Sequence, residues 1–144
     1  MTVVICVRPG KRGTGLRFAK VVFTVAGIWG ILQIVPMYFI FDYIGQKAPP
    51  TINHPEFYYG FAGVTLAWQF VFLLIGSNPR RYRTMMLPSI LEKASYVLAI
   101  IVLIVQHRLP VSIALPATSD FVLGVLFTSS FMKTISRDES PELQ

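Results

Sequence analysis

The stretch VVFTVAGIWGILQIVPMYFIF, residues 21–41, determines the fold class of this chain. Its 21 positions hold no charged residue, and a helix needs about 20 apolar residues to cross roughly 30 Å of hydrocarbon. Residues 21–32 are apolar on every side of a helix, whereas a surface helix of a soluble protein carries a polar stripe. The stretch therefore predicts a membrane-spanning helix rather than a buried helix of a soluble all-α protein.

Three further stretches lack charge, at residues 57–78, 94–106 and 121–132. The first is long enough alone, and the other two reach membrane length when they are extended back to Met85 and Val111. That extension requires Glu92 and Asp120 to lie near the membrane surfaces. Charged residues make up 14% of the chain, against about 25% in soluble domains. We expect an all-α four-helix transmembrane bundle.

Proline and capping signals predict where the helices begin and end. Pro36 predicts a kink inside the first helix, and Pro55 with Glu56 is typical of a helix start. The pattern Ser89-x-x-Glu92 fits a capping box at the start of the third helix. We expect helices at about 16–44, 56–77, 89–106 and 116–135, between a basic N-terminal arm (1–15) and an acidic C-terminal tail (136–144).

The basic residues mark one side of the membrane. Of the 13 lysines and arginines, 11 lie before the uncharged stretch 21–41, between the stretches 57–78 and 94–106, or after the stretch 121–132, and Lys93 is one of these. Only Lys47 and Arg108 lie in the other two loops. The positive-inside rule then predicts a multi-pass protein of the cell's inner membrane with both termini cytoplasmic. Because topology accounts for the net charge of +6, no nucleic-acid partner is expected.

Ionisable side chains at membrane depth are the default candidates for a site. In the predicted topology five of them gather on the outer side, from the ends of all four helices: Asp42, His54, Glu56, His107 and Asp120. If they converge, they could perform acid/base chemistry or bind a cation. The alternative is structural, because Glu56 and Asp120 fall in first helical turns, where a carboxylate is favourable. Asp42 differs, since it lies at the C-terminal end of the first predicted helix, where the helix dipole opposes it.

On the inner side, Arg80, Arg81 and Arg83 are candidates for contact with lipid headgroups or with a partner, and the alternative is a plain topology signal. Within the membrane, Gln33 and Gln69 are expected to hydrogen-bond between helices. Small residues predict the helix contacts. They are Gly60, Gly63 and Ala67 in the second helix, and Gly124 in the fourth, one turn after Asp120.

Several chemistries lack their sequence signature. The chain has no P-loop, no HExxH, no CxxC and no histidine pair at metal spacing, so neither a metal nor a cofactor is expected. Its single cysteine, Cys6, excludes a disulfide within the chain. The first helix also lacks the mid-membrane glutamate expected of a small multidrug-type proton antiporter.

The layout of four short helices, the turn Asn78-Pro79-Arg80-Arg81-Tyr82-Arg83 and the segment Asp120–Gly124 resemble the DoxX-like small membrane proteins over residues 18–135. The resemblance implies a four-helix fold and an association with membrane redox complexes, and it brings no catalytic residues. The basic arm and Pro36 depart from it.

Two functions follow as hypotheses. The first is an accessory or scaffold subunit of an inner-membrane assembly, such as a redox-linked one, without chemistry of its own. Its partners would be the lipid bilayer and a membrane protein or further copies of itself. The second is a membrane enzyme or small carrier that acts on a lipid, isoprenoid or quinone through the outer cluster.

Overall fold

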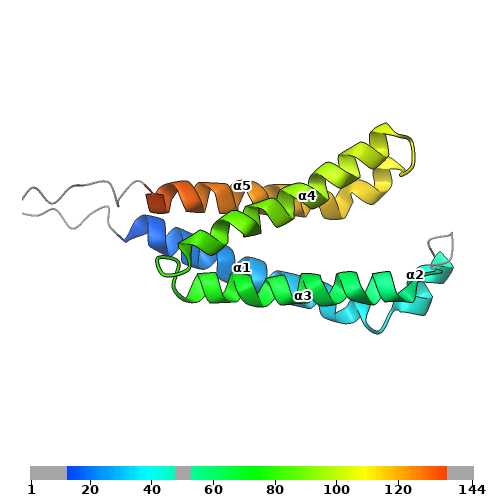
Figure 1. Cartoon of the computed structure of the whole chain (residues 1–144), viewed down its shortest axis with the longest axis horizontal. Coiled ribbons are helices and arrows are strands. Elements are labelled where there is room, and N and C mark those ends of the chain that lie inside the picture. Colours follow the sequence, from blue (N-terminus) through cyan, green and yellow to red (C-terminus); the bar gives the residue numbers. More distant parts are fainter. Residues whose placement is uncertain (1–12, 48–52, 136–144) are drawn as a thin grey trace, which may run out of the picture.

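The computed structural model describes residues 13–47 and 53–135, and these residues form helices and connecting turns without a strand (Figure 1). Four helices are long and apolar enough to cross a membrane, as predicted. They are α1 (Thr14–Met37), α3 (Pro55–Ser77), α4 (Met86–Val105) and α5 (Leu115–Ile135). Three short elements connect them: α2 (Phe41–Lys47), η1 (Arg83–Met85) and η2 (Val111–Ala114). Most of the basic arm, the Pro49-Pro50 loop and the acidic tail lie outside the described residues.

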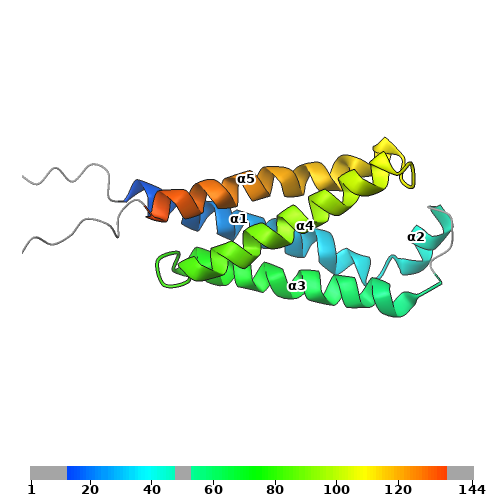
Figure 2. The same cartoon turned by 45° about the horizontal axis from the view of Figure 1, so that its top comes forward.

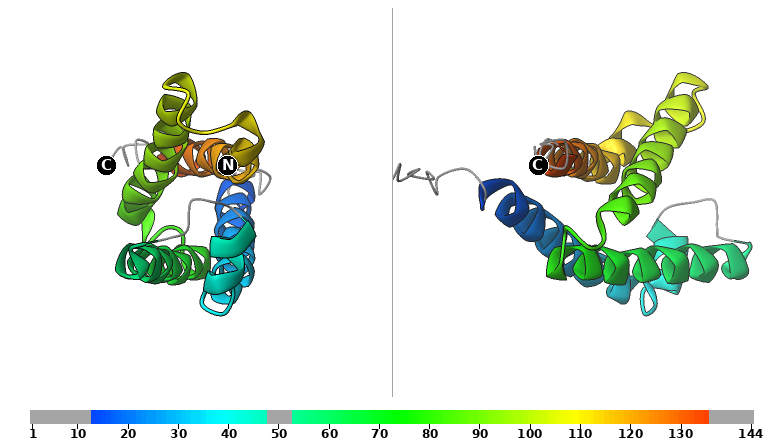
Figure 3. Two further views of the ribbon diagram at one scale, coloured as in Figure 1. Left: turned by 90° about the vertical axis from the view of Figure 1, so that its right-hand side faces the viewer. Right: turned by 60° about the vertical axis from the view of Figure 1, so that its left-hand side comes forward.

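The long helices form two pairs. Helix α1 packs along α3, α4 packs along α5, and α1 also packs against α5, which joins the pairs. Figure 1 shows the pairs close together at the end where the described chain starts and finishes, and further apart at the α2 end. Helix α4 leaves α3 near η1 and runs obliquely toward the far end of α5 (Figures 2 and 3). The middle of the bundle is therefore bordered by all four helices.

The buried core lies where the pairs meet. The rings of Phe23 in α1, Phe72 in α3 and Phe127 in α5 are fully buried. The Phe23 and Phe127 rings stack with centroids 4.2 Å apart, and Phe72 meets Phe127 edge-on at 5.0 Å. Because lipid is as apolar as these side chains, close packing rather than removal from water stabilises such a contact. The aromatic core thus fixes one end of the bundle.

Glycines allow the close approach of α1 to α3. A Cβ atom on Gly30 would overlap the side chain of Gln69, and one on Gly27 would lie 2.7 Å from Leu73 Cγ. The predicted α3 contact through Gly60 is wrong within this chain, because no described atom lies within 4 Å of a Cβ placed there. Gly124 does lie at a helix contact, where its Cβ would be 3.6 Å from Lys93 Cβ.

Two predicted boundaries need correction. The first predicted helix, 16–44, is two helices, because α1 ends at Met37 and α2 begins at Phe41. Pro36 lies in the last turn of α1, and the chain leaves the helix through short backbone hydrogen bonds from the Tyr38 N–H to the Val35 carbonyl and from the Phe39 N–H to the Pro36 carbonyl. The helix therefore ends directly after Pro36 instead of continuing to residue 44.

The capping box at Ser89 is also wrong. Helix α4 begins at Met86, directly after η1, and the Ser89 hydroxyl donates to the Met85 carbonyl from inside the helix. The helix can start before Ser89 because Pro88 occupies its first turn, where a missing N–H leaves no bond unmade. This earlier start draws Glu92 and Lys93 into the body of α4.

Candidate functional site

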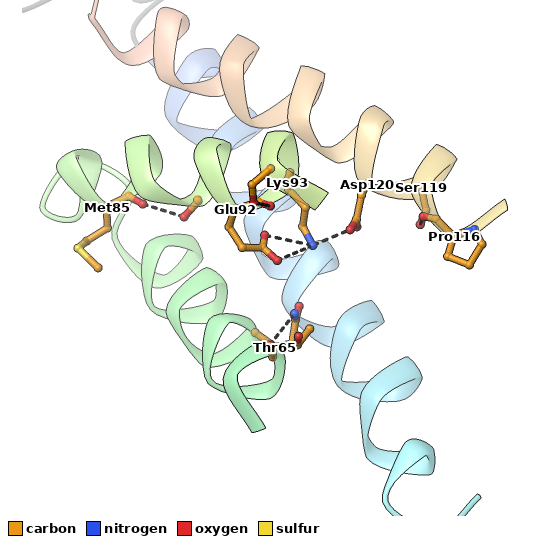
Figure 4. Close-up of polar contacts among 10 residues, drawn as sticks. Thr65, Met85, Glu92, Lys93, Pro116, Ser119 and Asp120 are labelled. Carbon is orange, nitrogen blue, oxygen red and sulfur yellow. Dashed lines mark hydrogen bonds and ion pairs between the residues drawn. The ribbon is translucent and has the colours of Figure 1, made fainter. Parts of the chain in front are cut away.

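Lys93 is a buried lysine in α4, with only 5% of its side chain exposed. Its Nζ lies 3.0 Å from Oδ1 of Asp120 in α5, and 3.4 Å and 3.3 Å from Oε1 and Oε2 of Glu92 (Figure 4). The ammonium also lies 5.4 Å from the ring centroid of Phe72 in α3, within the range of a cation–π contact. We call Glu92, Lys93 and Asp120 the buried charge cluster. Three helices hold its central cation.

The charges of the cluster do not balance. Two carboxylates share one ammonium, so the formal charge is −1. Glu92 Oε2 is buried and accepts no hydrogen bond. Lys93 Nζ lies 3.3 Å away, but its angle to this oxygen is unsuitable for a hydrogen bond. Among the described residues, no other basic side chain forms an ion pair with Glu92 or Asp120. Lys93 is thus the cation that pairs with both carboxylates.

A cavity of about 320 Å³ lies between the two helix pairs, beside the cluster. All four long helices line it, and Lys93 and Asp120 form part of its wall. Its other polar side chains include the amides of Gln33 and Gln69, and its aromatic ones are Trp29, Phe61 and Tyr96. Cavities of this size, mostly apolar with a few polar groups, are typical of small-molecule sites.

A second hollow, of about 440 Å³, is a more open groove between α4 and α5. It is lined mainly by apolar side chains such as Ile101, Phe121 and Val125, and Lys93 and Asp120 border it as well. The Lys93–Asp120 ion pair therefore stands between a cavity inside the bundle and a groove on its surface.

No protein-family model, curated protein or solved structure matches this chain. The resemblance to DoxX-like proteins therefore stays a prediction. The site has to be interpreted from its own geometry and from the four apolar helices, which indicate a multi-pass membrane protein.

The structure divides the predicted outer cluster. Asp120 turns to Lys93, while His54 Nδ1 lies 2.9 Å from Glu56 Oε1 in an exposed pair. His107 is exposed in the turn after α4, with the positive φ of 55° that such a turn accommodates. Asp42 and His107 form no ion pair with another described residue. A catalytic role for these residues stays a prediction.

The position of Asp42 within its helix also differs from the prediction. It lies in the first turn of α2 and not at the C-terminal end of a longer helix. A carboxylate at a helix N-terminus is stabilised by the helix dipole. The prediction that a helix dipole opposes Asp42 is therefore wrong, because the preceding helix ends at Met37.

The three inner arginines do not act alike. Arg80 and Arg81 are exposed, and Arg83 is half-buried with its guanidinium 5.3 Å from the ring of Phe131 in α5. The Arg81 backbone N–H donates to Asn78 Oδ1, which organises the turn. Arg80 borders a shallow hollow together with Arg17 and Lys20 of α1. Arg83 thus packs within the chain, while Arg80 and its neighbours face outward.

The sequence analysis does not predict Lys93 as a site residue, because it counts Lys93 among the basic residues of the inner side. The usable signal was the adjacent Glu92-Lys93 pair within an apolar stretch that already begins at Met85. Gln69 also departs from its prediction, because its amide donates to the Thr65 carbonyl of its own helix at 3.0 Å. Its side chain nevertheless packs across the interface, against Gly30.

Proposed function

We propose that this protein binds a small, mainly apolar molecule carrying one polar or charged group, in the cavity beside Lys93 and Asp120. The observation that carries the proposal is a 5%-exposed lysine whose carboxylate partner also lines a cavity of about 320 Å³. Charged groups within a membrane are costly and usually mark substrate or ion pathways. The protein would act as a membrane carrier or binding protein.

The walls of the cavity support this class of ligand. The aromatic side chains Trp29, Phe61 and Tyr96 offer apolar contact, and the amides of Gln33 and Gln69 offer hydrogen bonds. The groove between α4 and α5 leads from the lipid-facing surface to the same ion pair. A lipid-soluble ligand would have a lateral route toward the cluster.

For the topology we propose that both termini are cytoplasmic and that the membrane is the inner membrane. In support, the described ends of the chain lie together, since a Cβ on Gly15 would be 3.0 Å from the Lys133 carbonyl oxygen. Arg17, Lys20, Arg80 and Arg81 gather at that end of the bundle, as the positive-inside rule requires of a cytoplasmic face. The wider end of the bundle would then face outward.

The test of the binding proposal uses Trp29, which lines the cavity, as the reporter in a Trp68→Phe background. Three probes of one shape are titrated into the detergent-solubilised protein: benzyltrimethylammonium, neutral neopentylbenzene and anionic benzylsulfonate. We expect at least one of them to quench Trp29 saturably. Thr65→Phe, which fills the cavity, should abolish the quenching, whereas the lipid-facing Val64→Phe should leave it unchanged. If none of the probes quenches saturably, the proposed function is wrong.

One observation favours the accessory role as a second candidate. Gly60 and Ala67 lie exposed on α3, and no described atom covers Gly60. Small residues on a membrane helix allow another helix to approach closely. In a Cys6→Ser background, Gly60→Cys should then cross-link in membranes to a second chain, while Val25→Cys on the exposed face of α1 should not. Equal cross-linking of both variants would count against this role.

A further inference from the structure

We infer that the ligand of the cavity is a lipophilic organic cation, which competes with a proton for the negative charge of the buried charge cluster. This inference rests on the proposed function, because it names the charge class of the molecule that the cavity binds.

The first argument is the charge count. Lys93 Nζ is already shared between Asp120, at 3.0 Å, and Glu92, at 3.3 Å. The cluster therefore carries one negative charge more than its lysine neutralises. An anionic ligand would raise this excess to two charges in a medium of low dielectric, where like charges repel strongly. A cation or a proton would neutralise it, which favours either of them over an anion.

The surrounding helices supply no further charge. From α1 the polar cavity side chain is Gln33, from α3 they are Thr65 and Gln69, and from α5 Ser119 accompanies Asp120. From α4, Tyr96 is the remaining titratable group among the described residues that line the cavity, and a phenol is neutral at physiological pH. The extra negative charge is therefore neutralised by what enters the cavity and not by its walls.

The second argument concerns the kind of cation. Trp29, Phe61 and Tyr96 reach the cavity from three different helices. Aromatic walls are how proteins bind quaternary ammonium groups, through the negative faces of the rings. A metal ion would need several oxygen, nitrogen or sulfur ligands, and the described residues contain no group of three His, Cys, Asp or Glu that could hold one. An organic cation with an apolar body fits both the charge and the walls.

The exchange balances in charge. At a pH where the empty protein holds one proton on the carboxylate pair, the cluster is neutral. When the cation enters, it contacts Asp120, the carboxylate that lines both hollows, and that proton leaves to water. One bound cation thus releases one proton. Glu92 lies behind Lys93 and does not line either hollow, so its part is to hold the lysine and supply the extra negative charge.

The experiment compares the three probes on the Trp68→Phe protein. We expect benzyltrimethylammonium to bind at least tenfold more tightly than neopentylbenzene or benzylsulfonate. In weakly buffered solution, at a pH where the empty cluster keeps its proton, a pH indicator should report about one proton released per cation bound. In the same pH range, Kd should rise about tenfold for each unit of pH decrease, because one proton competes with one ligand.

Glu92→Gln separates charge from contact. It removes the extra negative charge, keeps the Lys93–Asp120 pair and leaves the cavity walls unaltered. We expect it to weaken binding of the cation about tenfold or more and to end the proton release, while binding of neopentylbenzene stays the same. The unchanged neutral probe also shows that the variant is folded. Asp120→Asn should weaken cation binding in the same way.

Each of the other possible results would overturn a defined part of the inference. If neopentylbenzene or benzylsulfonate binds the unaltered cavity as tightly as benzyltrimethylammonium does, the inferred positive charge of the ligand is wrong and the proposed function stands. If the cation binds without releasing a proton, the exchange is wrong. If Glu92→Gln leaves cation binding unchanged, the cluster charge does not select the ligand. If no probe binds, the proposed function and this inference both fail.

Discussion

Lys93 Nζ lies 3.0 Å from Asp120 Oδ1 and so joins α4 to α5 through a charge pair in the interior of an otherwise apolar bundle. Gly124, one turn beyond Asp120, lies at the same contact between the two helices, since a Cβ placed on it would be 3.6 Å from Lys93 Cβ. The pair borders both a cavity and a surface groove. The same two residues therefore carry both a stability cost and the proposed binding function.

Lys93→Met should destabilise the protein strongly. The apolar replacement has a similar length but leaves Glu92 and Asp120 as buried carboxylates without their cation, and breaking a buried pair in this way costs about 3–5 kcal/mol. Thermal unfolding in detergent would measure the loss. Lys20→Met, at an exposed lysine of α1, is the control and should change the unfolding free energy by less than about 0.5 kcal/mol. A similar small effect for both variants would contradict the burial of Lys93.

Gly30→Ala and Gly60→Ala form a matched pair on α1 and α3. A Cβ at Gly30 would overlap Gln69, and overpacking of this kind costs about 1–3 kcal/mol, whereas Gly60 has open space and gains helix propensity. We expect a lower unfolding temperature for the first variant and an unchanged or higher one for the second. Adding Gln69→Ala to Gly30→Ala should restore part of the loss, and a lack of any rescue would argue against this contact.

Phe127→Ala should remove the central ring of the aromatic core. Its ring is fully buried and contacts both Phe23 and Phe72, so truncation is expected to cost about 3–5 kcal/mol. Phe121→Ala, on the exposed face of the same helix, is the control and should have little effect. Chemical unfolding followed by circular dichroism would compare them. Equal stability of the two variants would contradict the burial of Phe127 in the aromatic core.

The topology can be tested by cysteine labelling in a Cys6→Ser background. Arg108→Cys, in the turn after α4, should react with a membrane-impermeant maleimide added to intact cells, because both predicted outer loops are on that side. Arg80→Cys should react only after permeabilisation. The reverse pattern would place both termini outside and would contradict the positive-inside assignment.

Much of the fold could be predicted from uncharged length alone. Four helices follow from the four apolar stretches, and Pro55 and Pro116 locate two helix starts within one residue. The errors came from local sequence signals that are compatible with two structures. A proline such as Pro36 fits both a helix that continues with a kink and a helix that ends nearby, and the turn that follows distinguishes them. Ser89 with Glu92 matches a capping box, yet η1 and Pro88 allow the helix to start earlier.

The site could be predicted only in part. Asp120 is a candidate from the sequence, but it is expected on the outer side, together with Asp42, His54, Glu56 and His107. Its actual partner is Lys93, which is expected on the inner side. Sequence periodicity places residues on a helix face, but the pairing of Lys93 with Asp120 depends on how far antiparallel α4 and α5 slide along each other. The oblique course of α4 along α5 is part of that register, and it cannot be read from either helix alone.

The coupling between Lys93 and Asp120 tests the central claim most directly. A double-mutant cycle of Lys93→Met and Asp120→Asn isolates their interaction from the effects of each residue alone. Measured as unfolding free energy in detergent, we expect a coupling of about 1.5–3 kcal/mol, with the double variant more stable than Lys93→Met alone. A coupling within about 0.3 kcal/mol of zero would mean that the two charges do not meet, and it would contradict the buried charge cluster on which the proposed binding site depends.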